Sequence, residues 1–151
     1  MSLLADSVDP PHVAADRGVA VAQRNGVRRA KYAHLVSVRV EGETGEAWIA
    51  EGVVGVGDTA RLTRWRDYEL DAQLEGHALV LFNENRPGVI VAVGSILGKH
   101  DVNITQVNHG VNAAKAQAVS LWSVETPVPT DALDEIRKAA HVARAVGVAL
   151  G

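Results

Sequence analysis

The sequence predicts an α+β protein made of two consecutive parts, residues 8–75 and 76–151. In the first part, apolar and polar residues alternate over short segments, which is the spacing of antiparallel strands. In the second part, two stripes of apolar residues at helical spacing separate strand-like segments. Glycine, proline and asparagine residues divide these segments from one another. A purely helical bundle is therefore excluded.

The first part is expected to contain one helix and several antiparallel strands. Asp9 and the two prolines after it suit the first turn of a short helix, which Gly18 closes. A strand is expected to begin at Val19, before the turn signal Asn25-Gly26. Further strands are predicted over residues 35–40, 47–56, 60–66 and 68–72.

The second part is predicted to have the order β-α-β-β-α-β, which is the ferredoxin-like arrangement. Strands are expected over residues 77–82, 102–107, 116–124 and 142–150, and residues 109–112 are predicted to turn the chain. Pro87 suits the start of the first helix, and Thr130 is predicted to cap the second. Both helices of such a unit cover one face of the sheet, so the other face needs a partner or a neighbouring domain.

Composition excludes several classes of protein. The chain has 151 residues, 47% of them apolar and 22% charged, which is normal for one globular domain or two small ones. It has no cysteine, so disulfides, thiolate metal sites and a cysteine nucleophile are excluded. No apolar stretch is long enough to span a membrane, and no signal pattern is present, so we expect a cytoplasmic protein. The net charge of −3 argues against general nucleic-acid binding.

No catalytic motif is found in the sequence. Glycine-rich nucleotide-binding loops are absent, and the six histidines show no metal-ligand spacing. Asp67, Glu69 and Asp71 alternate and could bind a cation, although a solvated strand edge is the more probable role. We expect this chain by itself to have no catalytic residues, no metal and no cofactor.

Residues 83–90, with the sequence Asn-Glu-Asn-Arg-Pro-Gly-Val-Ile, are followed by Gly94, Leu97 and the segment Val102-Asn103-Ile104. This pattern resembles the opening of an ACT domain, in particular the C-terminal regulatory domain of the D-3-phosphoglycerate dehydrogenase family. Residues 8–19 and the hairpin over 36–55 resemble the intervening, allosteric-substrate-binding domain of the same family. The resemblance covers about residues 8–150, and the family's nucleotide-binding and substrate domains are missing.

The resemblance implies a regulatory function. In this family serine, the end product of the pathway, binds at ACT–ACT interfaces and inhibits the enzyme, whose cofactor is NAD. The binding positions correspond to Asn83, Asn85 and Asn103. The chain is then expected to bind L-serine or another small amino acid and to form a homo-oligomer through its ACT sheets.

General chemistry agrees with an amino-acid ligand. Asparagine amides offer donors and acceptors for an ammonium, a carboxylate and a hydroxyl group. The start of the helix near Pro87 adds N–H groups that attract a carboxylate. The alternative is that Asn85 only caps this helix and Asn103 only holds a turn.

A basic stretch lies between Gly18 and Val40, where the sequence has no acidic residue. The resemblance implies that such stretches bind anions, including phosphorylated substrate, and Arg24, His34 and Arg39 lie nearest to the family's basic positions. Arginine suits phosphate because its planar guanidinium binds in a bidentate manner. The alternative is a solvated loop with basic side chains.

Two other functions remain open at this point. The chain could be a structural oligomerisation domain without a ligand, or the regulatory part of an L-serine dehydratase, although a Ser-x-His-Thr-like stretch typical of that family is absent.

Overall fold

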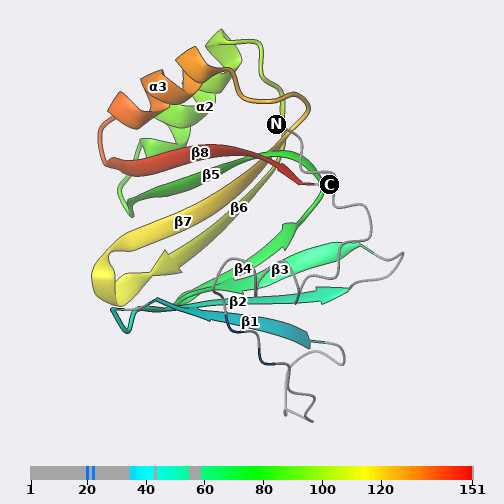
Figure 1. Cartoon of the computed structure of the whole chain (residues 1–151). Helices are drawn as coiled ribbons and strands as arrows, with labels where there is room; N and C mark the ends of the chain where they lie inside the picture. The colour runs from blue at the N-terminus through cyan, green and yellow to red at the C-terminus, as the bar shows by residue number, and fades with distance from the viewer. Residues whose placement is uncertain (1–19, 21, 23–34, 43, 55–58, 151) are drawn as a thin grey trace. The chain divides into compact units, whose positions relative to one another are not determined.

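Two four-stranded antiparallel sheets form the described part of the protein (Figure 1). The computed structural model describes residues 20, 22, 35–42, 44–54 and 59–150. All the strands and helices below belong to one unit of the chain, residues 32–151. The predicted helix over residues 9–16 and the strand expected from Val19 lie outside the described residues.

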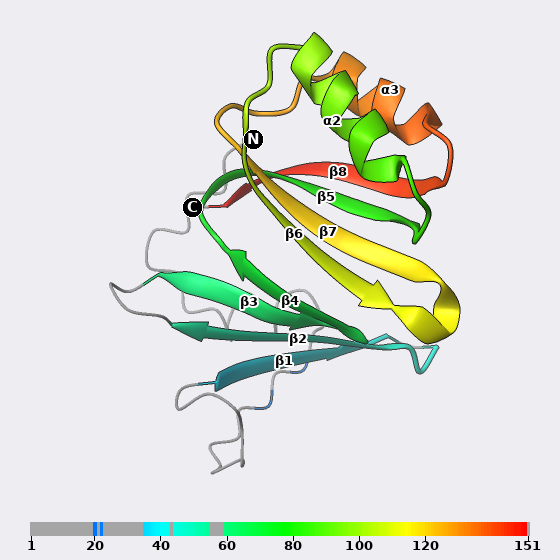
Figure 2. The ribbon, with the colours of Figure 1, turned by 180° about the vertical axis from the view of Figure 1, so that it is seen from behind.

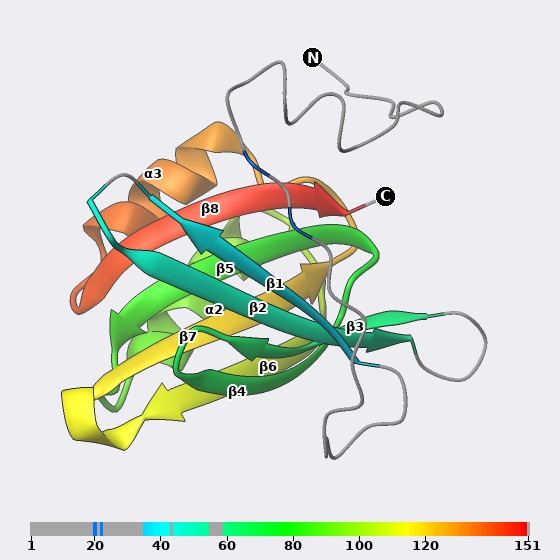
Figure 3. The same cartoon turned by 60° about the horizontal axis from the view of Figure 1, so that its bottom comes forward.

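The first sheet has the strand order β1-β2-β3-β4 (Figure 3). Its strands are β1 (Leu35–Glu41), β2 (Ala47–Val54), β3 (Ala60–Trp65) and β4 (Tyr68–Gln73). The four strands predicted after residue 34 are thus confirmed. Between β1 and β2 the chain turns at Gly45, whose φ of 80° is a left-handed conformation that glycine adopts without steric cost.

The second sheet has the predicted β-α-β-β-α-β order. Its elements are β5 (Gly76–Glu84), α2 (Val89–Lys99), β6 (Ile104–Asn112), β7 (Gln117–Val124), α3 (Thr130–Lys138) and β8 (Val142–Leu150). The strands lie in the spatial order β6-β7-β5-β8. Both helices lie on the same face of this sheet (Figure 2).

Two local predictions for this sheet are wrong. Residues 109–112 do not turn the chain but continue β6, because β7 pairs with β6 as far as Asn112 opposite Gln117. The turn follows in a short 3-10 helix, Ala113–Lys115, which the Asn112 side chain caps by accepting the Lys115 N–H at 3.2 Å. Thr130 does not cap α3 but is its first residue, after Pro129.

Each face of the second sheet has its own apolar core. On the helix face, buried side chains of β5, β7, α2 and α3 form the larger core, with Trp122, Leu79 and Leu97 among its largest members. On the opposite face, Ala78 and Leu121 pack with Ala72 of β4, and Leu62 of β3 lies against them. The first sheet therefore supplies the cover that the open face of a ferredoxin-like unit needs.

Candidate functional site

Asn83 is the most deeply buried of the predicted site residues. It lies near the end of β5 and is only 4% exposed, on the same face of the strand as the core residues Leu79 and Leu81. Its side-chain Nδ2 donates to the Glu84 main-chain oxygen at 2.6 Å, whereas its Oδ1 is buried and has no partner among the described residues. A buried carbonyl oxygen without a hydrogen bond costs about 1–3 kcal/mol, so this atom is a ready acceptor for a donor from outside.

Asn85 lies in the turn after β5 and is exposed. Its main-chain N–H donates to the Ala116 oxygen at 2.8 Å, which ties this turn to the turn between β6 and β7. The interpretation of Asn85 as a helix cap is wrong, because Gly88 occupies the N-cap position of α2 and no side chain caps this helix. The Gly88 φ of 89° explains why a glycine stands at this position.

The start of α2 therefore has N–H groups that no side chain satisfies. These groups and the helix dipole give this end of the helix a partial positive charge, which favours a carboxylate. No acidic residue lies in the first turn of α2 to compete for that position.

Asn103 lies at the opposite end of the sheet. It precedes β6, and its main-chain oxygen accepts the Glu125 N–H at 3.1 Å. Its neighbour Ile104 pairs with Val124, which in turn pairs with His77 at the start of β5. Asn83 is six residues further along β5, about 20 Å away at the rise of a strand. One chain thus brings Asn83 and Asn85 to the same end of the sheet and leaves Asn103 at the other end.

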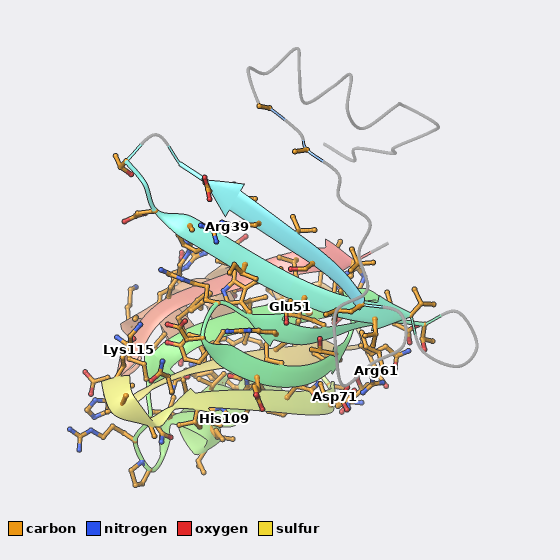
Figure 4. The ribbon with its side chains drawn as sticks, turned by 90° about the horizontal axis from the view of Figure 1, so that it is seen from below. Arg39, Glu51, Arg61, Asp71, His109 and Lys115 are labelled. Carbon is orange, nitrogen blue, oxygen red and sulfur yellow. The ribbon has the colours of Figure 1, made fainter. Side chains whose placement is uncertain are left out.

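Of the predicted anion-binding residues, only Arg39 is described, and Arg24 and His34 lie outside the described residues. Arg39 is exposed on β1, and its Nε binds the Glu41 carboxylate at 2.6 Å (Figure 4). Arg61 binds Asp71 of the neighbouring strand in the same way, at 2.8 Å. Carboxylates thus already neutralise these two cations.

Among the three alternating carboxylates, two are bound by cations of the protein. Lys115 Nζ lies 2.9 Å from Asp67 Oδ2, and its hydrogen bond and charge lower the pKa of Asp67 below its usual range. Asp71 is bound by Arg61. No group of three or more possible metal ligands occurs among the residues that the structure describes. Within the same residues, no helix is long and apolar enough to cross a membrane.

Sequence patterns did not indicate His141, which contacts Glu84, the residue between Asn83 and Asn85. Its Nδ1 is 3.0 Å from Glu84 Oε2, and its main-chain oxygen accepts the Glu84 N–H at 2.9 Å. Arg86 Nε lies 3.6 Å from the same carboxylate oxygen. Glu84 and His141 are 57 residues apart in the sequence, so only the pairing of β5 with β8 could have revealed their contact.

A small cleft lies at the Asn103 end of the sheet. Its cavity volume is about 200 Å³, and most of the residues that line it are polar: Gln73, Glu75, Gly76, His77, Thr105, Gln106, Ser123 and Val124. Thr105 lies at an irregularity in the pairing of β6 with β7, and its hydroxyl donates to the Ser123 oxygen at 3.2 Å. None of the three predicted asparagines lines this cleft.

Comparison with known proteins finds a family match for β5, β6 and β7 and for both helices. Residues 77–141 match the model of the ACT domain, a non-catalytic type of domain that generally binds small amino-acid ligands. Most of the chain matches the C-terminal region of D-3-phosphoglycerate dehydrogenases. The enzyme of Synechocystis sp. is 26% identical over 137 residues, 91% of this chain. That of Archaeoglobus fulgidus is 27% identical over 128 residues, 83% of this chain. The enzyme of Bacillus subtilis is 25% identical over 121 residues, 80% of the chain.

The chain matches only part of each of these relatives. The match covers 24% of the Synechocystis enzyme, 24% of the Archaeoglobus enzyme and 23% of the Bacillus enzyme. The chain therefore spans about a quarter of the length of these relatives.

Proposed function

We propose that this ACT-domain chain is a regulatory module that binds a small free amino acid, with L-serine as the first candidate. It would sense the end product for a D-3-phosphoglycerate dehydrogenase, as the named relatives suggest. The observation that carries the proposal is the buried, unpartnered Oδ1 of Asn83, at the end of the sheet where the uncapped helix α2 begins. A ligand with an ammonium donor and a carboxylate suits these two features.

The separation of the three asparagines indicates that two chains form one site. A small amino acid is far shorter than the distance of about 20 Å between Asn83 and Asn103 in one chain. A ligand that contacts all three positions must therefore take Asn103 from a second copy.

The β6 edge is the surface through which we expect the two copies to pair. Among the strands that the structure describes, β6 is at one end of its sheet, so one of its edges has no neighbouring strand there to form hydrogen bonds. Val107 and Val111 of β6 and Ile90 and Val91 of α2 are exposed apolar residues. An apolar rim beside an open strand edge is typical of a surface that pairs with another chain.

Antiparallel pairing of two β6 strands would also complete the site. The end of β6, at Asn112, lies beside Asn85, because the Asn85 N–H binds Ala116 in the following turn. The start of β6 follows Asn103 directly. In an antiparallel pair the start of one strand lies beside the end of the other, so each copy would bring its Asn103 toward the partner's Asn85. A ligand held between them would favour one relative orientation of the two copies and could so bias attached catalytic domains.

Calorimetry with L-serine tests this function. We expect the unaltered dimer to bind L-serine. Asn85→Ala and Asn103→Ala should each weaken the free energy of binding by about 1–3 kcal/mol. If the two residues belong to different copies, a mixture of these two variants regains one unaltered site in each mixed dimer. Gln106→Ala, which removes an exposed amide near Asn103 on β6, serves as the matched control and should bind normally.

The alternative functions give different results. A structural oligomerisation domain would remain a dimer and show neither heat nor a thermal shift with millimolar serine or any other amino acid. If the protein binds serine and neither asparagine variant weakens the binding, the sensing function would stand, but the binding site would lie elsewhere in the protein. The regulatory part of an L-serine dehydratase would also bind serine, and the sequence upstream of Leu3 in the parent protein would distinguish it from a dehydrogenase.

A further inference from the structure

We propose that Asp67, in the turn between β3 and β4, is a positioning residue of the amino-acid site and holds Asn85 in place through Lys115. The inference rests on the proposed function, because Asn85 is one of the residues that we assign to the ligand. It gives the first sheet a part in ligand binding, although none of the three asparagines belongs to that sheet.

The turn between β6 and β7, residues 113–116, connects Lys115 with Asn85. The Ala116 main-chain oxygen accepts the Asn85 N–H at 2.8 Å, so the backbone of Asn85 lies where this turn places it. Within the turn, the Asn112 side chain accepts the Lys115 N–H at 3.2 Å. Ala116 has a φ of 48°, in the left-handed region that alanine rarely adopts. A backbone conformation of this kind persists only where surrounding contacts hold it.

The turn between β3 and β4 supplies contacts that hold the β6–β7 turn. Asp67 Oδ2 lies 2.9 Å from Lys115 Nζ. The next residue, Tyr68, is only 8% exposed, and its hydroxyl donates to the Gln117 side chain at 3.3 Å. Because Gln117 directly follows the β6–β7 turn, the first sheet holds this turn at two neighbouring points.

The backbone around the Asp67–Lys115 pair makes it more effective than an isolated surface ion pair. Both side chains are 57% exposed, and an exposed pair usually contributes little, since two side chains must be ordered to form it. Here the backbone on each side is already held, by the Tyr68 hydroxyl and by the Asn112 side chain. Without the pair the β6–β7 turn has more freedom, and the ligand must order it on binding, which weakens the affinity.

The test is the affinity of the dimer for L-serine, measured by calorimetry on variants that neutralise one charge. Asp67→Asn and Lys115→Gln should each bind about threefold more weakly, which is the contribution expected of such a pair. The double variant should bind no more weakly than either single variant, because both changes remove the same contact. Lys115→Arg keeps the cation and should bind normally. Asp71→Asn is the matched control, because it removes the same charge from the same hairpin, where Asp71 contacts Arg61 of the neighbouring strand (Figure 4).

Hydrogen exchange of the Asn85 main-chain N–H, measured by NMR without ligand, gives a second readout. This N–H is protected by its bond to the Ala116 oxygen, so it reports directly on the contact between the two turns. Asp67→Asn should make it exchange about threefold faster, by the same contribution of the ion pair. Asp71→Asn should leave its exchange unchanged.

The outcomes separate this inference from the proposed function. If the unaltered protein binds no amino acid, both are overturned. If it binds serine and Asp67→Asn has the same affinity, or if Asp71→Asn weakens binding as much, only the role of Asp67 is overturned. Additive losses in the double variant would mean that Asp67 and Lys115 act separately, which also contradicts the inference. A merely structural role would lower the free energy of unfolding of Asp67→Asn but change neither its affinity nor the exchange of the Asn85 N–H, and this result would likewise overturn it.

Discussion

Gly110 of β6 lies directly against the backbone of Glu69 in β4. A Cβ atom at Gly110 would come within 2.5 Å of the Glu69 main-chain oxygen and within 3.3 Å of the Tyr68 Cβ. The first sheet thus packs on the strand that we expect to pair with a second copy. The hydroxyl of Tyr68 donates a further hydrogen bond to the Gln117 side chain, at the start of β7, at 3.3 Å.

Gly110→Ala should destabilise the protein. The new methyl group forces β4 away from β6, and overpacking of this kind typically costs about 1–3 kcal/mol. Urea denaturation would measure the loss in the free energy of unfolding. Gly98→Ala is the matched control, because a Cβ there meets nothing within 4 Å and alanine favours the helix α2. Equal stability of Gly110→Ala and the unaltered protein would contradict the close packing of the two sheets.

Val107→Glu should convert the proposed dimer to a monomer. A carboxylate in an apolar strand-pairing surface must be desolvated without a partner, which disfavours association. Sedimentation or light scattering would measure the change in mass. Val38→Glu places the same charge on an equally apolar residue of β1, which is 53% exposed, and should leave the mass unaltered. If Val38→Glu dissociates the dimer and Val107→Glu does not, the copies pair through the first sheet instead.

Ser120→Ala should destabilise the larger core. Trp122 Nε1 donates to Ser120 Oγ at 2.8 Å, and both residues are almost wholly inaccessible to solvent. The variant leaves the indole N–H buried without an acceptor, at a cost of about 1–3 kcal/mol in the free energy of unfolding. Thr105→Ala removes a hydrogen bond on the surface and should cost much less. Similar losses for the two variants would mean that the indole finds another acceptor.

The stabilising contribution of Glu135 should be lost in acid, so the free energy of unfolding should fall at low pH. Hydrogen bonds from His100, at 3.0 Å, and from Lys99, at 2.9 Å, lower the pKa of Glu135 below its usual range. The folded state therefore favours the carboxylate, so its contribution is present above the ordinary pKa of glutamate, about 4.3, and is lost as the pH falls through the lower folded value.

Urea denaturation between pH 3 and pH 7 would measure this loss. Glu135→Gln should reduce the dependence of the free energy of unfolding on pH below 5, whereas Glu125→Gln, on the surface after β7, should leave that dependence almost unchanged. An identical acid profile for Glu135→Gln and the unaltered protein would show that the His100 and Lys99 contacts do not contribute in solution.

Local patterns predicted most of the strands and helices because both sheets follow simple spacing rules. The alternation over residues 35–40 predicted a strand, although residues on both faces of β1 are exposed, and the continuous apolar run over 77–82 predicted a largely buried one. The pattern was misleading at residues 109–112, where the sequence His-Gly-Val-Asn resembles a turn. There the hydrogen bonds of β7 determine the structure, and these come from residues that follow in the chain.

In the predicted site, too, local patterns indicated some features, and contacts between distant residues determined the others. The motif at residues 83–90 indicated Asn83 and Asn85 directly, and the structure places them near the end of β5 and in the turn that precedes α2. The position of Asn103 relative to them depends on the fold, because α2 runs the length of the sheet and places Asn103 at the other end. Sequence order carries no information on a contact such as that of His141 with Glu84, which depends on two strands that are distant in the chain.

By itself the sequence determined the type of each element, the β-α-β-β-α-β order and the asparagines of the motif, because these depend on residues that are near each other in the chain. Only the tertiary structure decided that the first sheet covers the open face of the second, that Asn83 keeps a buried oxygen without a partner, and that Asn103 lies far from it. The physical reason is that strand pairing and burial bring together groups from distant parts of the chain, and a distance between such groups is fixed by packing and not by spacing.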